Sequence, residues 1–185
     1  MKKSLLHAFY WSFLIILSCG HVATSQNAVL SNPSACGLGL PLTDNSCPEN
    51  GVFYNPDRFA INVTNAPGTR LGVDVYLREV RLLIRHTWVG DLDISLISPS
   101  GKTIVLSFDN GGGNDHYGNP DDLTCSTLAV LSVASCVSIK NAEAPFTQQP
   151  YLPEESFLLF NDGVTNPNGR WILQICDDVA EDVGT

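Results

Sequence analysis

Basic residues are scarce in this sequence, and their scarcity limits what the protein can bind. Ten Lys and Arg stand against 19 Asp and Glu, so the formal net charge is −9. Nucleic-acid binding depends on basic patches that neutralise phosphates, and this acidic balance therefore argues against nucleic acid as a partner. The acidity is compatible with a soluble exported protein and with bound cations.

Long hydrophobic runs are also lacking. The longest, Leu5–Leu17, is shorter than the roughly 20 residues that a transmembrane helix needs, so we expect no transmembrane span. This run follows Lys2 and Lys3 and leads into small and polar residues through Ser25. The order is typical of a secretory signal peptide, predicted over residues 1–25. We therefore expect a secreted or cell-surface protein.

Two cleavage sites remain open. Cleavage after Ser25 would make Gln26 the mature N-terminus, whereas the stretch before Cys19 resembles a bacterial lipobox and would make a lipidated Cys19 the first residue. One lipid chain would hold the membrane only marginally. Cleavage before Gln26 leaves 160 residues with a formal charge of −11. We expect residues 26–50 to form a linker or disulfide-tied lead-in, and residues 51–185 to form one domain with its own core.

Zinc-type cysteine spacing is absent, and the cysteines outside the signal region favour disulfides in an oxidising compartment. Cys36 with Cys47, and Cys125 with Cys136, would each close a short loop, so we predict these two disulfides. Cys176 is then left over. It would be a buried thiol, or its partner would lie beyond Thr185.

Helical periodicity is almost absent from residues 51–185. Short alternating apolar runs separated by turn residues predict an all-β fold. The pattern predicts a strand over residues 73–77 and, after a bulge near Arg78–Glu79, a second strand that buries its even-numbered residues as far as His86. Leu92, Ile94 and Leu96 share one face of the next predicted strand.

Downstream of these strands the sequence predicts turns, one long loop and two more strands. Ser98–Gly101 has the composition of a type I turn that returns the chain into residues 102–106. Residues 109–122 are rich in Gly, Asn and Asp and form a polar loop of the kind that often carries function. The last two predicted strands are Ser156–Phe160 and Trp171–Cys176.

A family resemblance is carried by His86–Gly101, which has the sequence HTWVGDLDISLISPSG. It resembles the core of the P domain (P/Homo B domain) of subtilisin/kexin-like proprotein convertases, written HTxxGDLxIxLxSPxG. Further counterparts follow in the family's order between residues 73 and 185. They are Gly111–Asp115, Ala144–Phe146, Pro153, Leu158–Phe160, Asn168–Leu173 and Asp177–Asp178.

The resemblance implies a jelly-roll-like, galactose-binding-like β-sandwich. In convertases this domain packs against the subtilisin-like catalytic domain, keeps it folded and influences its calcium and pH dependence. The family domain normally ends in another strand, after an Asp-x-Gly like Asp182–Gly184. Because the sequence stops at Thr185, we expect the final strand to be missing and a sheet edge to be left unpaired.

Catalysis by this chain is not expected. In convertases the catalytic domain precedes the P domain, whereas only a signal peptide and a short linker precede it here, and no G-x-S-x-G elbow occurs. His86 continues the buried phase of Leu82 and Ile84, which favours a hydrogen-bonded core-edge histidine over a general base. A triad would need Ser, His and Asp in mutual contact. The sequence leaves open whether the full-length protein carries a protease.

Two functions from different classes therefore remain. The first is a non-catalytic accessory module of a secreted multidomain protein, whose partner is a neighbouring protease or adhesion domain of the same polypeptide. The alternative is a free-standing surface module that binds carbohydrate or protein. Trp88 and Tyr117 sit in loop-like surroundings and are candidates for stacking on a ligand, although packing in the core or at its rim is the more common role of such aromatic residues.

Calcium is the predicted cofactor. Ca²⁺ takes six to eight oxygen ligands, often carboxylates from irregular loops. Asp91 and Asp93 lie two apart on one predicted strand face, and other acids come from the polar loop and from either side of the last strand. The competing interpretation is that these acids are solvated or cap turns. The candidate ligands are Asp91, Asp93, Asp115, Asp121, Asp122, Asp177, Asp178 and Asp182.

Overall fold

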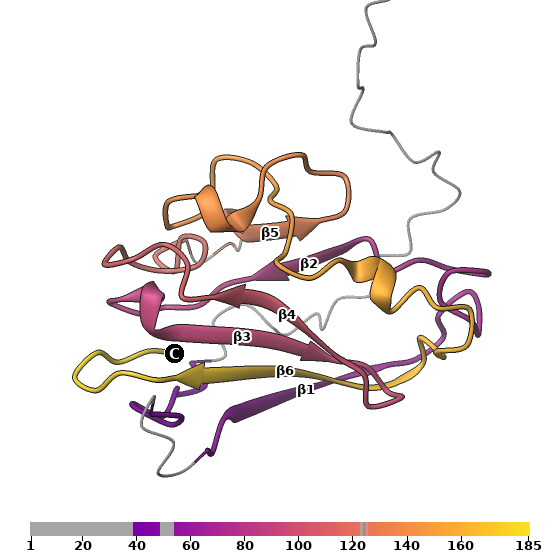
Figure 1. Cartoon of the computed structure of the whole chain (residues 1–185), viewed down its shortest axis with the longest axis horizontal. Coiled ribbons are helices and arrows are strands. Elements are labelled where there is room, and N and C mark those ends of the chain that lie inside the picture. The colour runs from indigo at the N-terminus through magenta and orange to yellow at the C-terminus, as the bar shows by residue number, and fades with distance from the viewer. Residues whose placement is uncertain (1–38, 49–53, 123, 125) are drawn as a thin grey trace, which may run out of the picture.

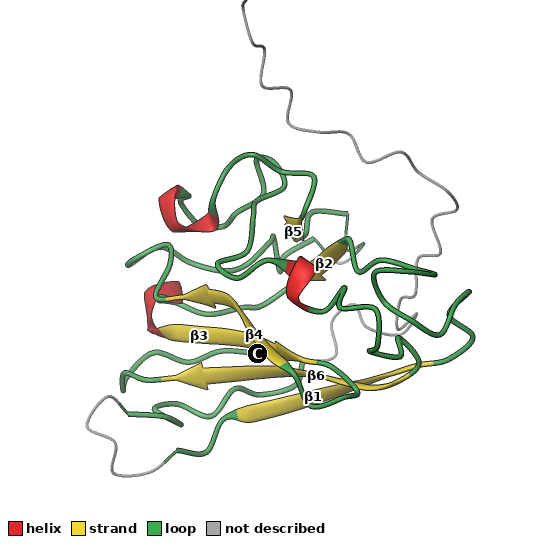
Figure 2. Cartoon of the chain, turned by 45° about the vertical axis from the view of Figure 1, so that its right-hand side comes forward, coloured by secondary structure: helices red, strands yellow, loops and turns green. Residues whose placement is uncertain are grey.

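The computed structural model describes residues 39–48, 54–122, 124 and 126–185. In these residues the regular structure consists of six β-strands and three single-turn 3₁₀ helices, so the all-β prediction is confirmed (Figure 2). The strands are β1 Asp57–Val63, β2 Glu79–Leu82, β3 Leu92–Ile97, β4 Thr103–Phe108, β5 Ala129–Ser132 and β6 Gly169–Asp177. The 3₁₀ turns are η1 Val89–Asp91, η2 Ile139–Asn141 and η3 Phe157–Leu159.

The larger sheet is antiparallel with the strand order β1-β6-β3-β4 (Figure 1). Its second strand, β6, contains the predicted strand Trp171–Cys176, which is therefore confirmed. Pairing is continuous on both sides of β6. Ile61 of β1 lies opposite Trp171 of β6, and Leu96 of β3 lies opposite Leu173 of β6. The last residues of β6 consequently lie beside the first residues of β3.

Strand β3 buries the face that the sequence predicts. Leu92 and Ile94 are fully buried and Leu96 is nearly so, while the residues between them are partly exposed. The predicted turn Ser98–Gly101 closes with a hydrogen bond of 2.9 Å from the Gly101 amide to the Ser98 carbonyl oxygen, and Gly101 takes a φ of +85°. A glycine is favoured there because other residues are strained at positive φ. The chain then returns as β4.

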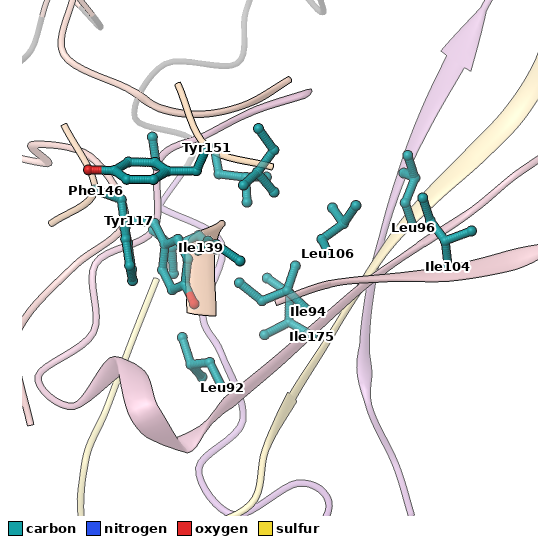
Figure 3. Close-up of a cluster of buried hydrophobic side chains, with 14 of the residues drawn as sticks. Leu92, Ile94, Leu96, Ile104, Leu106, Tyr117, Ile139, Phe146, Tyr151 and Ile175 are labelled. Atoms are coloured by element: carbon teal, nitrogen blue, oxygen red, sulfur yellow. The ribbon is translucent and has the colours of Figure 1, made fainter. Parts of the chain in front are cut away.

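The smaller sheet consists of β2 and β5 and lies above the larger one in Figure 1. Buried residues of both sheets belong to a single hydrophobic cluster. In Figure 3 the core side chains of β3 and β4 share this cluster with Tyr117, Phe146 and Tyr151, which come from loops. Burying each such side chain contributes about 1.5–3 kcal/mol, which makes this cluster the main stabilising feature. The jelly-roll arrangement stays a prediction.

The strand predicted over residues 73–77 is wrong, because this segment forms a turn. Asp74 accepts a backbone hydrogen bond of 3.1 Å from the Arg70 amide, and the amide of Asp74 in turn donates to the Arg70 carbonyl oxygen at 3.0 Å. Local side-chain bonds of this kind compete with sheet pairing and outweigh the β-propensity of the valines. Val73 is half exposed as a result. The bulge predicted near Arg78–Glu79 is wrong for the same reason, because residues 73–77 form no strand ahead of β2, which begins at Glu79 and pairs with β5 in a regular register.

The strand predicted over Ser156–Phe160 is wrong as well. Ser156 accepts a hydrogen bond of 3.2 Å from the Leu158 amide and so caps η3. Phe157 and Phe160 are fully buried, whereas Leu158 and Leu159 are exposed. A spacing of three between buried residues fits one turn of 3₁₀ helix. The sequence did not reveal this spacing, because Leu158 and Leu159 between the two phenylalanines are also apolar.

The predicted disulfide between Cys36 and Cys47 is wrong, because Cys47 is bonded to Cys176 across 129 residues, with Cα atoms 5.5 Å apart. Cys176 is therefore not left over. A backbone hydrogen bond of 2.9 Å from Cys47 to Asp177 holds the two segments together. Short loops minimise closure entropy but say nothing of which cysteines the sheet brings into contact. Cys36 and Cys125 lie outside the described residues, while Cys136 is disulfide-bonded.

Nowhere in the described part of the chain is there a helix with the length and apolar character needed to cross a membrane.

Candidate functional site

Polar residues gather at the end of the larger sheet where β3 begins and β6 ends. Leu92, the first residue of β3, is paired with Asp177, the last residue of β6. This register brings η1, which precedes β3, next to the segment that follows β6, and the Asp178 amide donates to the Asp91 carbonyl oxygen at 3.0 Å. We call the group the end cluster and define it as His86, Asp91, Asp177, Asp178 and Asp182.

His86 and Asp177 form a buried pair at the centre of the end cluster. The distance from His86 Nε2 to Asp177 Oδ2 is 3.0 Å, and both side chains are excluded from solvent. His86 Nδ1 lies 2.8 Å from the carbonyl oxygen of Trp88. Burial alone would lower the pKa of His86, but the hydrogen bond to Asp177 and the charge of Asp177 outweigh it, so the pKa is raised.

This environment confirms the prediction that His86 is a hydrogen-bonded core histidine. A general base must reach the proton of a substrate with a free nitrogen. Both ring nitrogens of His86 are within hydrogen-bonding distance of protein oxygens, and the ring is buried. The pair instead ties the segment after β2 to the end of β6.

Asp91 lies in η1 and not in the strand, contrary to the sequence prediction, and it is buried. Burial raises the pKa of its carboxyl, and the charges of Asp177 and Asp182 raise it further. Asp182 is held over the cluster by a hydrogen bond of 2.5 Å from the Thr87 hydroxyl. The end cluster therefore concentrates negative charge around a single histidine.

Asp93 lies two residues after Asp91, within β3, and has different neighbours. Burial raises the pKa of its carboxyl to about 7, with smaller contributions from the charges of Asp109, Asp178 and Glu154. Among the described residues, neither Asp93 Oδ1 nor Asp177 Oδ1 has a hydrogen-bond partner, although both atoms are buried. A buried acceptor without a hydrogen bond costs folding free energy, so each of these two oxygens lowers the stability of the fold unless another group binds it.

The eight predicted calcium ligands do not form one group. Asp91, Asp177, Asp178 and Asp182 come together, and Asp93 adjoins them through Asp178. The other three are engaged elsewhere. Asp121 pairs with Arg85 at 2.7 Å, Asp122 caps the turn at Thr124 and Ser126, and Asp115 lines a surface groove.

A cage of metal ligands is not formed by the described residues, since no three or more His, Cys, Asp or Glu side chains gather closely enough to hold an ion. The pairing of Asp177 with His86 also removes one oxygen that a cation would need. The buried Asp177 oxygen without a partner is the feature that favours a cation beside Asp91. Asp93 pairs with Cys176 and so faces the other side of the sheet. Calcium at this end of the sheet stays a prediction.

The two candidate ligand-stacking aromatics differ in their placement. Tyr117 is fully buried, stacks at 4.6 Å between ring centroids with Phe146 and hydrogen-bonds through its hydroxyl to Ser107 at 2.8 Å. Its prediction as a binding residue is therefore wrong, because it belongs to the core. Trp88 is 48% exposed and lies over Gly113, where any side chain would collide with the indole ring.

Next to Trp88 the long polar loop forms one side of an open groove of about 530 Å³. Its lining includes Asn114, Asp115 and His116 from the loop, together with Thr127, Ala144, Pro145 and Thr147. The sequence placed the loop correctly but did not indicate its partner segment, because residues 144–147 carry no ligand-type pattern. Glu154 was also missed, because its contacts with Phe108 and Asn110 join residues that are distant in the sequence. It lies beside Asp93 and accepts hydrogen bonds from Asn110 and from the Phe108 amide.

Comparison with known proteins gives one family match. Residues 78–134 match the family model described as the proprotein convertase P-domain, which confirms over that range the resemblance seen in the sequence. No curated protein matches the chain. Among solved structures, the chain is similar to the crystal structure of a serine protease of Aeromonas sobria, with 15% sequence identity and a TM-score of 0.21. That similarity covers 70% of this chain and 23% of the other chain.

Proposed function

We propose that this chain supplies a non-catalytic accessory module to a secreted multidomain protein, as P domains do for subtilisin-like proteases. The observation that carries the proposal is the match of residues 78–134 to the proprotein convertase P-domain. The segment includes β2, β3, β4 and β5, together with His86. It therefore contains four of the six strands and one half of the buried His–Asp pair.

The environment of His86 supports the non-catalytic part of this proposal. Its ring is buried and both nitrogens face protein oxygens, one of them from Asp177. A histidine held in this way stabilises the fold and does not activate a nucleophile. The module would act on a neighbouring domain of the same polypeptide by contact.

The proposal can be tested by domain coupling in the full-length polypeptide. Replacing Cys47 and Cys176 by Ala weakens this module without touching its surface. We expect scanning calorimetry to show that a neighbouring domain melts at a lower temperature in this variant than in the native polypeptide. A neighbour that melts at an unchanged temperature would contradict the accessory role. So would peptide cleavage by the purified chain that a serine-directed inhibitor abolishes.

The second candidate is a carbohydrate-binding surface module, and the specific observation in its favour is the polar groove beside Trp88. Hydroxyl-rich ligands use hydrogen bonds from Asn and Asp together with stacking on an exposed ring. Titration of the purified chain with oligosaccharides should then quench or shift tryptophan fluorescence. Titration calorimetry, which does not need the indole as a reporter, should show that Trp88→Ala abolishes binding. Leu158→Ala, an exposed apolar residue outside the groove lining, is the matched control. Equal loss in both variants would count against the groove.

Export is part of the proposal and has its own measurement. Mass spectrometry of the mature protein distinguishes a start at Gln26 from a lipidated start at Cys19. Retention of residues 1–25 in the mature protein would refute the signal peptide.

A further inference from the structure

Three polar side chains from separate segments gather around one carboxylate beside the end of β4. They are Lys140, Asn110 and Glu154, and we call them the Lys–Asn–Glu group. Lys140 Nζ lies 2.8 Å from Glu154 Oε2. Asn110 Nδ2 donates a hydrogen bond of 2.7 Å to Glu154 Oε1. The two oxygens of one carboxylate therefore bind an amine nitrogen and an amide nitrogen.

The backbone sets the position from which each of the three side chains extends. Asn110 follows β4 directly after Asp109, whose φ of +50° turns the chain. The Glu154 amide donates to the Leu106 carbonyl oxygen at 3.1 Å, which fixes this segment along β4. Lys140 lies in η2. The group is therefore assembled by contacts between segments that are distant in the sequence.

Asn110 and Glu154 are the fixed members of the group. Asn110 is buried, and its Nδ2 also donates to the Ser107 hydroxyl at 3.0 Å, which in turn is hydrogen-bonded to the Tyr117 hydroxyl at 2.8 Å. Both hydrogens of the Asn110 amide group are thus engaged, so the plane of the amide is fixed. The Glu154 side chain is 12% exposed, and its Oε1 also accepts a hydrogen bond of 3.0 Å from the Phe108 amide.

Lys140 is the movable member of the group. Its side chain is 59% exposed, and an exposed ion pair of this kind contributes little to stability. A lysine amine is also a nucleophile that attacks carbonyl carbons once a neighbouring group has taken its proton. Attack requires the nitrogen to come within about 3–3.5 Å of the carbon. The exposed stem of Lys140 leaves the amine free to move from the carboxylate to the adjacent Asn110 amide.

The carboxylate of Glu154 is in the state that can accept a proton. Burial would raise its pKa, but hydrogen bonds from Lys140, Asn110 and the Phe108 amide outweigh burial, so the pKa is lowered. The carboxylate is within hydrogen-bonding distance of both nitrogens that would exchange protons. This is the geometric requirement for a general base that later acts as a general acid.

We propose that Lys140 and Asn110 become joined by an intramolecular isopeptide bond, with Glu154 as the catalytic residue. Glu154 takes a proton from the Lys140 ammonium, and the neutral amine attacks the Asn110 side-chain carbonyl carbon. Glu154 then returns the proton to Nδ2 as the bond between Nδ2 and the carbon breaks. A second proton from Lys140 Nζ leaves with the released ammonia, so the products are one new amide and one ammonium ion.

Holding the two reacting groups together replaces chemical activation, because groups kept in contact react far faster than the same groups free in solution. The step consumes no oxidant and no cofactor. The bond would tie η2 to the end of β4, across 30 positions of the sequence. The proposal does not depend on the proposed function.

The mass of the intact purified chain, measured after reduction of its disulfides, tests the proposal. We expect the native chain to be lighter than its sequence mass by one ammonia. Lys140→Arg keeps the positive charge without the nucleophile, and Glu154→Gln keeps the shape without the base, so both variants should have the full sequence mass. Lys102→Arg is the matched control, because the Lys102 amine pairs with Asp162 outside the Lys–Asn–Glu group. It should lose ammonia as the native chain does.

A digest distinguishes the isopeptide bond from a succinimide, which an Asn–Gly pair such as Asn110–Gly111 can form with loss of the same ammonia. Tandem mass spectrometry should find one branched peptide that joins the segments containing residues 110 and 140. A native chain of full mass would overturn the proposal, and so would a loss of ammonia that is confined to a linear peptide or retained in Lys140→Arg. A loss retained in Glu154→Gln would overturn the role of Glu154. The native chain alone decides whether the bond exists, even if the variants do not fold.

Discussion

Replacing Asp93 by Asn should stabilise the protein, and the gain should depend on pH. Asp93 lies in β3 with one carboxylate oxygen lacking a partner among the described residues, and burial raises the pKa of its carboxyl to about 7. A carboxyl whose pKa is raised on folding binds its proton more tightly in the folded state than in the unfolded one. Its favourable contribution is therefore complete below the unfolded pKa of 3.8 and is lost as the pH rises through about 7.

The size of the effect follows from the shift. A change from 3.8 to about 7 corresponds to at most about 4 kcal/mol of differential stability. Asp93 is partly exposed, and water screens its charge, so we expect about 1–2 kcal/mol at pH 8. Asn removes the charge and nearly preserves the shape. Near pH 4 the folded native protein is already neutral at this residue, and the gain from Asn should nearly vanish.

Urea unfolding of the native protein and of Asp93→Asn, at pH 4 and pH 8 and with a chelator present, measures this difference. The chelator matters because a bound cation would neutralise the carboxylate and mask the gain. Asp162→Asn is the control of opposite sign, since hydrogen bonds from the Thr165 and Val164 amides lower the pKa of Asp162 to about 2. A variant of Asp93 that is less stable at pH 8, or that gains equally at both values, would refute the electrostatic reasoning.

Three further predictions test other parts of the structure. Replacing Cys47 and Cys176 by Ala should lower the free energy of unfolding by up to about 5 kcal/mol, because the bond closes a loop of 129 residues. Denaturation with and without reductant measures this loss, and a native protein whose stability does not change with reductant would contradict the prediction. Tyr117→Phe should cost about 1 kcal/mol through the lost hydrogen bond to Ser107 while leaving ligand titrations unchanged; altered binding would restore Tyr117 as a binding residue. If calcium binds at the end of the sheet, a chelator should lower the melting temperature and Asp91→Ala should remove that difference; identical melting curves with and without chelator would end the calcium hypothesis.

Periodicity located the strands whose burial alternates. Leu92, Ile94 and Leu96 repeat with a period of two and are buried as predicted, and the turn at Ser98–Gly101 follows from its own residues. These features depend on neighbours in sequence. Where the alternating pattern predicted a strand that does not form, a local hydrogen bond from a backbone amide to a side chain stabilises another conformation. The Arg70 amide donates to the Asp74 carboxylate, and the Leu158 amide donates to the Ser156 hydroxyl.

Features that depend on distant residues could not be predicted from the sequence. Cys176 and Asp177 are the last residues of β6, and the fold places Cys47 and His86, which are distant in the sequence, beside them. These contacts give the Cys47–Cys176 disulfide and the His86–Asp177 hydrogen bond. The tyrosine at position 117 has polar neighbours in sequence but aromatic neighbours in space. Its burial follows from contacts with Phe146, which no local pattern indicates.

The bond between Cys47 and Cys176 also orders events during synthesis. Cys47 emerges from the ribosome 129 residues before its partner, which at about 5–20 residues per second is an interval on the order of 10 s. Throughout that interval its thiol is available to any nearer cysteine, and Cys36 is only 11 positions away in the sequence. A bond between those two, once made, has to be exchanged before the sheet can be locked. Thiol–disulfide exchange is the reaction that would release Cys47 from such a bond for its partner in the sheet.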